Sequence, residues 1–94
     1  MYCGGITPVR PFNRQEHKEL TKFLYQEFSN GRPVLIRTQL VAGMNYFVRL
    51  ELDSDYSSQN QTYWHVRIYR DLNGDFHTHS IKKGLASSDQ LVYF

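Results

Sequence analysis

The sequence predicts an α+β fold in which one amphipathic helix covers a face of a four- to five-stranded antiparallel sheet. Two observations support this prediction: one stretch has helical periodicity, and several later stretches alternate with a period of two. Seven Tyr and six Phe among 94 residues also favour a sheet, because aromatic rings pack well on a pleated surface. An amphipathic helix needs an apolar surface to cover, and a sheet with one apolar face provides it.

Residues 1–12 are predicted to form an extended and flexible arm. Gly4 and Gly5 are adjacent, and Pro8 and Pro11 oppose helix formation. No periodicity is present in this stretch. The simplest alternative to a functional arm is a frayed terminus.

A helix is predicted to follow the arm. Asn13 is a suitable N-cap, and Glu16, three residues later, completes a capping box. The predicted apolar stripe consists of residues that recur at helical spacing, namely Leu20, Phe23, Leu24 and Phe28. Gly31 is expected to end the helix, because glycine adopts the left-handed conformation easily.

The rest of the chain is predicted to form strands, over residues 34–41, 46–52, 64–69, 76–83 and 91–94. Apolar residues alternate in 46–52 and 64–69, so each is expected to be a half-buried strand. His65 falls on the polar side of its strand in this pattern. Asn73-Gly74 predicts a tight type I′ hairpin, because both residues tolerate a positive φ.

Length and composition exclude several classes of protein. The 94 residues fit a single domain, 1–94, and the net charge of +2 is dispersed, so we expect no nucleic-acid partner and no membrane patch. No apolar stretch approaches the length of a membrane span. The single cysteine, Cys3, predicts a reducing, cytoplasmic location, and the start at Met1 shows no signal-peptide pattern.

No set of residues predicts catalysis, a metal or a cofactor. Cys3 lies on the arm, where no pocket lowers its pKa enough to make it a nucleophile. His77 and His79 share one strand face, but two ligands are too few for a metal site. A further alternative is that single-stranded nucleic acid stacks on Tyr46, Phe47, Tyr63 and Tyr69, but three nearby arginines make a weak basic groove. We therefore expect a binding protein and not an enzyme.

The pentapeptide Gln39-Leu40-Val41-Ala42-Gly43 lies between two predicted strands. Apolar residues at an exposed hairpin tip suggest a contact surface. The pentapeptide resembles the Gln-x-Val-x-Gly signature of the cystatin family. Segments 1–4, 64–72 and 90–94 also resemble the stefin class of that family, so the resemblance covers nearly the whole chain.

This resemblance implies a sheet wrapped around one helix and a reversible, competitive inhibitor of papain-like cysteine proteases such as cathepsins. In that family, an arm and two hairpins form a wedge that enters the active-site cleft. The matching residues are Cys3, Gly4 and Gly5 in the arm, Gln39, Leu40, Val41, Ala42 and Gly43 in the first hairpin, and Leu72, Asn73 and Gly74 in the second.

The sequence departs from the stefin pattern in two places. Stefins usually have Leu-Pro in the second hairpin, where this chain has Leu72-Asn73, and the stretch between Gly5 and Gln39 is shorter than usual. These departures leave open a cystatin-fold interaction module that does not inhibit proteases.

The resemblance also implies a possible change of assembly. Stefins exchange segments between two chains when the first hairpin straightens, and Val41 matches a residue that is strained in the family. We expect the monomer to be active and a domain-swapped dimer to be inactive.

Overall fold

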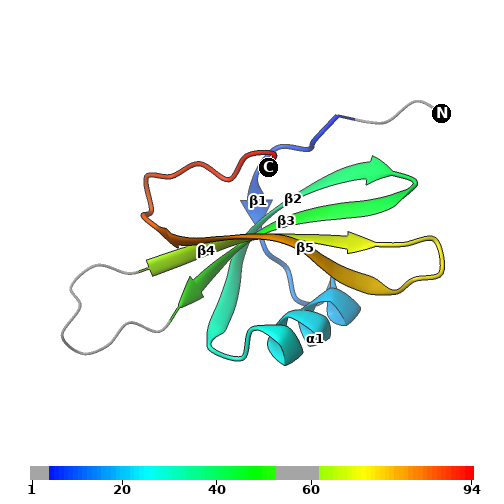
Figure 1. Cartoon of the computed structure of the whole chain (residues 1–94), viewed down its shortest axis with the longest axis horizontal. Helices are drawn as coiled ribbons and strands as arrows, with labels where there is room; N and C mark the ends of the chain where they lie inside the picture. The colour runs from blue at the N-terminus through cyan, green and yellow to red at the C-terminus, as the bar shows by residue number, and fades with distance from the viewer. Residues whose placement is uncertain (1–4, 53–61) are drawn as a thin grey trace.

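The computed structural model describes residues 5–52 and 62–94. Within these residues the elements are β1 (Arg10–Pro11), α1 (Lys18–Glu27), β2 (Gly31–Val41), β3 (Gly43–Leu52), β4 (Thr62–Arg70) and β5 (Phe76–Leu85). The strands pair antiparallel in the order β1-β2-β3-β4-β5, and α1 lies on one side of the sheet (Figure 1). The predicted α+β fold is confirmed. Among the described residues no helix is long and apolar enough to cross a membrane.

The core lies between α1 and the sheet. Leu20 and Leu24 of the helix are buried together with five strand residues, which are Ile36, Val48, Leu50, Val66 and Ile68. Aromatic pairs close the two ends of this core, Phe23 with Phe76 and Phe28 with Trp64. The predicted helical stripe and the predicted apolar faces of β3 and β4 are therefore confirmed.

The helix begins later than the sequence predicts. Oδ1 of Asn13 accepts hydrogen bonds from the backbone N–H groups of Gln15 (2.9 Å) and Glu16 (3.1 Å), but the turn that it caps ends before α1 begins at Lys18. The His17 ring packs against Phe12 and Tyr46, and its backbone (φ −123°, ψ 53°) is not helical. Asn13 therefore makes the predicted bond to the Glu16 N–H, but it caps the preceding turn; the N-cap residue of α1 is His17, which makes no side-chain cap hydrogen bond.

Gly31 does not have the predicted left-handed conformation. It is the first residue of β2 and has no positive φ. A Cβ at this position would lie 3.3 Å from Cβ and Cδ1 of Leu50 on β3. Space, and not backbone conformation, favours glycine here.

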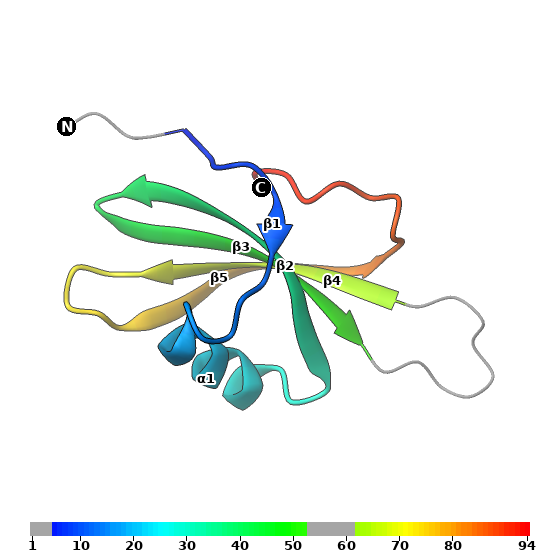
Figure 2. The ribbon, with the colours of Figure 1, turned by 180° about the vertical axis from the view of Figure 1, so that it is seen from behind.

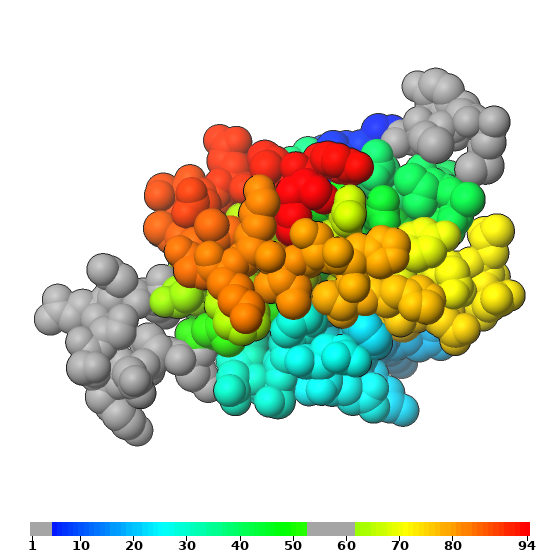
Figure 3. All heavy atoms as spheres, in the orientation of Figure 1, coloured from blue at the N-terminus to red at the C-terminus, as the bar shows by residue number. Residues whose placement is uncertain are grey.

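The C-terminal segment, residues 86–94, passes over the sheet face opposite α1 (Figure 3). Residues 91–94 are not the predicted strand, although Leu91 is buried. The Phe47 ring lies 5.6 Å from the Tyr93 ring and 6.0 Å from the Phe94 ring, centroid to centroid. Strand β3 is consequently buried on both faces over residues 47–50, and the prediction of a half-buried strand is wrong there.

Arg49 connects the C-terminal segment to the sheet. Its Nε donates to Nε2 of His65 (3.0 Å), and its Nη atoms donate to the carbonyl oxygens of Ser87 and Asp89. His65 is on the side away from the helix, as predicted, but it is only 2% exposed. Burial lowers the pKa of His65 to about 4, and the positive charge of Arg49 acts in the same direction.

Candidate functional site

The two hairpins named by the sequence project from the same end of the sheet. In this meander the β2–β3 and β4–β5 connections lie together, as Figures 1 and 2 show. The arm runs antiparallel to β2, and Ile6 forms a bridge with Gln39 near the first hairpin. We call residues 5–7, 39–43 and 71–75 the hairpin edge.

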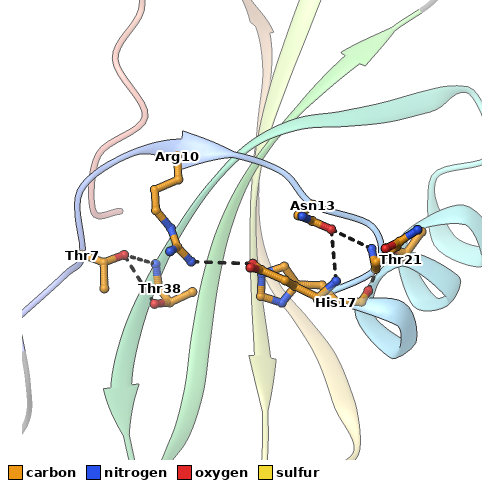
Figure 4. A network of polar contacts seen from close by, with 8 residues as sticks. Thr7, Arg10, Asn13, His17, Thr21 and Thr38 are labelled. Carbon is orange, nitrogen blue, oxygen red and sulfur yellow. Dashed lines mark hydrogen bonds and ion pairs between the residues drawn. The ribbon is translucent and has the colours of Figure 1, made fainter.

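The arm is fixed to β2 from Ile6 onward. Thr7 N–H donates to the Thr38 carbonyl (2.8 Å), and Thr38 N–H donates to Oγ1 of Thr7 (2.9 Å), as Figure 4 shows for the second bond. Arg37 donates from Nε to the Thr7 carbonyl and from Nη1 to the Leu91 carbonyl, each at 2.8 Å. The prediction that the arm is flexible is therefore wrong for residues 6–12, which are hydrogen-bonded to β2. A strand of two residues, such as β1, is too short to produce a periodic pattern in the sequence.

The start of the arm is open. Gly5 is exposed, and a Cβ built on it would meet no atom within 4 Å. The predicted site residues Cys3 and Gly4 lie outside the described residues.

The first hairpin presents an apolar tip on a closely packed turn. Leu40 is 59% exposed, Ala42 is exposed and Val41 is half-buried. Gly43 has a φ of 108°, and a Cβ on it would lie 2.3 Å from the Arg70 carbonyl oxygen. No described residue other than glycine has a positive φ, so Val41 does not show strain of this kind.

Gln39 stabilises the base of the first hairpin. Its Oε1 accepts a hydrogen bond from Nδ2 of Asn45 (3.2 Å), and its side chain is half-buried. Gln39 also faces Asn45 in the β2–β3 register and Ile6 in the bridge to the arm. Gln39, the first residue of the pentapeptide, thus connects three segments: β2, β3 and the arm.

The second hairpin is not the predicted type I′ turn. Gly74 N–H donates to the Asp71 carbonyl (3.0 Å), and Asp71 N–H donates to the Asp75 carbonyl (2.9 Å). Asn73 has no positive φ, whereas Gly74 has a φ of 89°. These features define a type I turn over Leu72 and Asn73 followed by a left-handed glycine, the common three-residue hairpin loop. The turn leaves Leu72 81% exposed.

Asp71 organises this turn. Its Oδ1 accepts from the N–H groups of Asn73 (2.9 Å) and Asp75 (3.0 Å), and its Oδ2 lies 2.8 Å from Nε2 of His77. The hydrogen bond with His77, followed by the backbone hydrogen bonds, lowers the pKa of the Asp71 carboxyl. His77 and His79 both stack on the Tyr69 ring, and the described residues contain no group of three or more His, Cys, Asp or Glu side chains placed to hold a metal.

The aromatic residues of the nucleic-acid alternative do not form one exposed platform. Tyr46 packs beside the helical core, and Phe47 is 0% exposed under the C-terminal segment. What the hairpin edge offers instead is apolar area on hydrogen-bonded turns, with Leu40 and Leu72 the most exposed. This arrangement suits the binding of a partly apolar cleft.

Comparison with known proteins identifies the family. No protein-family model matches the chain. Cystatin-A1 of Dictyostelium discoideum is 36% identical over 101 residues, a match that covers all of both proteins. Cystatin-A of Mus musculus (27% identical over 103 residues) and Cystatin-B of Bos taurus (28% over 104 residues) also match over the full length of both chains. The chain therefore belongs to the cystatin family, in its stefin class, a family of cysteine protease inhibitors and not of enzymes.

Proposed function

We propose that this protein is a reversible, competitive inhibitor of papain-like cysteine proteases of the cathepsin type. The hairpin edge would enter the active-site cleft as a wedge. The observation that supports this most directly is that the arm and both hairpins lie at one end of the sheet (Figure 1). Membership of the cystatin family gives the class of partner.

Binding in this proposal depends on apolar contact and rigidity. Leu40 and Leu72 are the most exposed apolar side chains of the two tips, and burial stabilises a complex by about 25 cal/mol per Å² of apolar area. Hydrogen bonds already hold both hairpins, so docking would order few new groups. The wedge blocks substrate by occupying the cleft and forms no bond with the protease nucleophile.

We assign the residues of the wedge in three groups. Cys3, Gly4 and Gly5 would contact the non-primed side of the cleft. Residues Gln39–Gly43 would lie near the catalytic cysteine of the protease, with Leu40, Val41 and Ala42 in contact. Leu72, Asn73 and Gly74 would cover the primed side.

Titration of papain with purified monomer tests the proposal, with a fluorogenic peptide substrate as readout. We expect stoichiometric, competitive and reversible loss of activity at nanomolar concentration, which corresponds to about −12 kcal/mol. Leu72→Ala should weaken inhibition, whereas Tyr25→Phe on α1, far from the edge, should not. Full protease activity at micromolar monomer would instead favour a cystatin-fold interaction module without inhibitory activity.

We further propose that only the monomer inhibits. A dimer formed by straightening the β2–β3 hairpin would convert residues 39–43 into continuous strand and remove one of the three contacts. The test is to separate monomer and dimer by size after mild heating and to titrate each against papain. Full inhibition by a purified swapped dimer would contradict this proposal.

We infer that the chain acts as a single domain in the cytoplasm. The single cysteine and the stefin class support a reducing location. Fractionation of cells that express the full chain, followed by detection with an antibody, should find it in the cytosolic fraction, and recovery in a secreted fraction would contradict the inference.

A further inference from the structure

The last two residues of β4 and Asp71, which follows them directly, each make side-chain contacts with a different part of the two hairpins. We propose that Tyr69, Arg70 and Asp71, here called the β4 brace, are positioning residues that hold both hairpins in the conformation that binds protease. In this proposal the brace supplies the rigidity that a proline would give to a Leu-Pro loop. Leu72 and Asn73 can therefore still contact the protease. The inference rests on the proposed function, and it assigns a role to residues outside the predicted wedge.

Tyr69 fixes the first hairpin. Its hydroxyl donates to the carbonyl of Ala42, at the tip of the β2–β3 turn. Gly43 lies so close that a Cβ on it would be 2.9 Å from the Tyr69 ring and hydroxyl. The Tyr69 ring also stacks on the His79 ring, with centroids 5.1 Å apart. The tip of the first hairpin is therefore packed against β4 and hydrogen-bonded to it.

Arg70 fixes the second hairpin to the helix. Its Nε donates to the Gly74 carbonyl (3.3 Å), and its Nη2 lies 2.5 Å from Oε2 of Glu19 on α1. The guanidinium also lies 5.0 Å from the centroid of the Phe76 ring. One side chain thus joins the loop, the start of β5 and the helix. The backbone carbonyl of Arg70 also lies close to Gly43 of the first hairpin, where a Cβ would be 2.3 Å from its oxygen.

Asp71 fixes the shape of the second turn itself. Its carboxylate accepts from two backbone N–H groups of the loop and contacts His77 on β5, as described above. Proline is disfavoured at the position of Asn73 in a type I turn, because it would displace the preceding residue from the helical region. This loop therefore cannot be stiffened as a Leu-Pro loop is, and the Asp71 contacts take that role.

Loss of a brace contact is expected to lower the fraction of molecules whose hairpins are in the conformation that binds protease. When only part of a population has the binding conformation, the apparent Kd rises in inverse proportion to that fraction. Loss of a brace contact should therefore weaken inhibition without unfolding the sheet, because none of the three side chains belongs to the core between α1 and the sheet.

The first experiment compares each brace variant with a matched control at a distance from the edge. Tyr69→Phe is paired with Tyr25→Phe. Arg70→Lys is paired with Arg32→Lys, because Arg32 also ion-pairs with a glutamate, Glu51. Asp71→Ala is paired with Asp89→Ala, because the Asp89 carboxylate also accepts a backbone hydrogen bond, from Ala86 N–H. Kd for papain and Tm are measured for all six. We expect each brace variant to raise Kd by roughly 5–30-fold with a Tm change like that of its control. Unchanged Kd in all three brace variants would overturn the proposal.

A double-mutant cycle then asks whether the brace acts through Leu72. If Asp71 matters because it places Leu72, Asp71→Ala should cost much less affinity in a Leu72→Ala background than in the wild type. A general structural role would give additive losses, and additive losses would refute the positioning role.

Amide hydrogen exchange of the free protein separates this inference from the proposed function. The Gly74 N–H, which donates to the Asp71 carbonyl, should exchange faster in Asp71→Ala and Arg70→Lys, while amides in β3 keep their rates. If wild-type protein fails to inhibit papain, the proposed function falls but faster Gly74 exchange still supports the brace. Unchanged Gly74 exchange in both variants overturns the brace whatever the inhibition assay shows.

Discussion

At the tip of the first hairpin, Gly43 is required both by backbone conformation and by space. Residues that carry a side chain rarely adopt its backbone φ of 108°, and a Cβ would lie 2.3 Å from the Arg70 carbonyl oxygen. We predict that Gly43→Ala lowers the free energy of unfolding by more than the roughly 1–3 kcal/mol expected for an unfavourable backbone alone. Urea unfolding measures this loss.

Two other glycines allow the two causes at Gly43 to be separated. Gly84 has a φ of 68° but would meet no atom within 4 Å, and Gly5 has neither constraint. Gly84→Ala should therefore show the backbone cost alone, and Gly5→Ala should stay within about 0.5 kcal/mol of wild type. Equal losses at Gly43 and Gly84 would show that the close contact with Arg70 relaxes without cost.

The turn type of the second hairpin determines whether position 73 can accept proline. Asn73→Pro would recreate the Leu-Pro pair of typical stefins, but here it would place proline at the second central position of a type I turn. It would also remove the N–H that donates to Asp71 Oδ1. We predict that the variant inhibits papain less well than wild type, by roughly tenfold or more, from the loss of at least one hydrogen bond. Tighter inhibition by Asn73→Pro would show that the loop adopts the Leu-Pro conformation when bound.

At the scale of elements, the C-terminal segment acts as a second layer although it forms no strand. Leu91 is 2% exposed, Phe47 is covered by the Tyr93 and Phe94 rings, and Arg37 and Arg49 hold the backbone carbonyls of the segment. This explains why β3 is buried on both faces. The segment is anchored by side chains of the sheet, and not by a ladder of backbone hydrogen bonds.

Leu91 should therefore contribute to stability like a residue of the main core. We predict that Leu91→Ala lowers the free energy of unfolding by about 2–5 kcal/mol, the range for a buried leucine. Val92, its neighbour, is 41% exposed, and Val92→Ala should change stability by less than about 0.5 kcal/mol. Chemical denaturation of both variants gives the comparison, and similar small losses in the two would mean that the segment is only loosely attached.

At the scale of the whole molecule, periodicity in the sequence predicted the elements that bury one clear face. The stripe of Leu20 and Leu24 and the alternation in β3 and β4 gave the helix, the sheet and the order of elements correctly. The pentapeptide at residues 39–43 gave the position of the first hairpin. Each of these signals is local, so a single sequence contains it in full.

The features that the sequence did not predict depend on contacts between distant segments. β1 is only two residues long and is defined by its pairing with Ile36 and Leu35, which no pattern within the arm encodes. Burial of Arg49 and His65 depends on a segment that follows them by more than twenty residues. Tyr69 and Arg70 likewise look like ordinary strand residues until the hairpins are folded against them.

The buried Arg49–His65 pair should make the stability of the whole fold depend on pH. The pKa of His65 is about 4 in the folded protein and about 6.5 in the unfolded chain, so between these values the unfolded state binds a proton that the folded state does not. Stability is therefore complete above about pH 6.5 and falls as the pH is lowered toward 4, by about 3 kcal/mol in total. The lowered pKa of His17 acts in the same direction.

Urea unfolding at pH 7.5 and at pH 4.5 tests this dependence on the intact chain. In His65→Gln, the amide oxygen can still accept from Arg49 Nε but does not titrate, so we predict a clearly smaller loss of stability between the two pH values than in wild type. His79→Gln, at an exposed position on β5, should keep the wild-type loss. Because Arg49 also donates to the carbonyls of Ser87 and Asp89, protonation of His65 should loosen the C-terminal segment first. The protection factors of the segment's amides should then be lower at pH 4.5 than at pH 7.5 in wild type but not in His65→Gln, and an equal change in the two would mean that another group controls the transition.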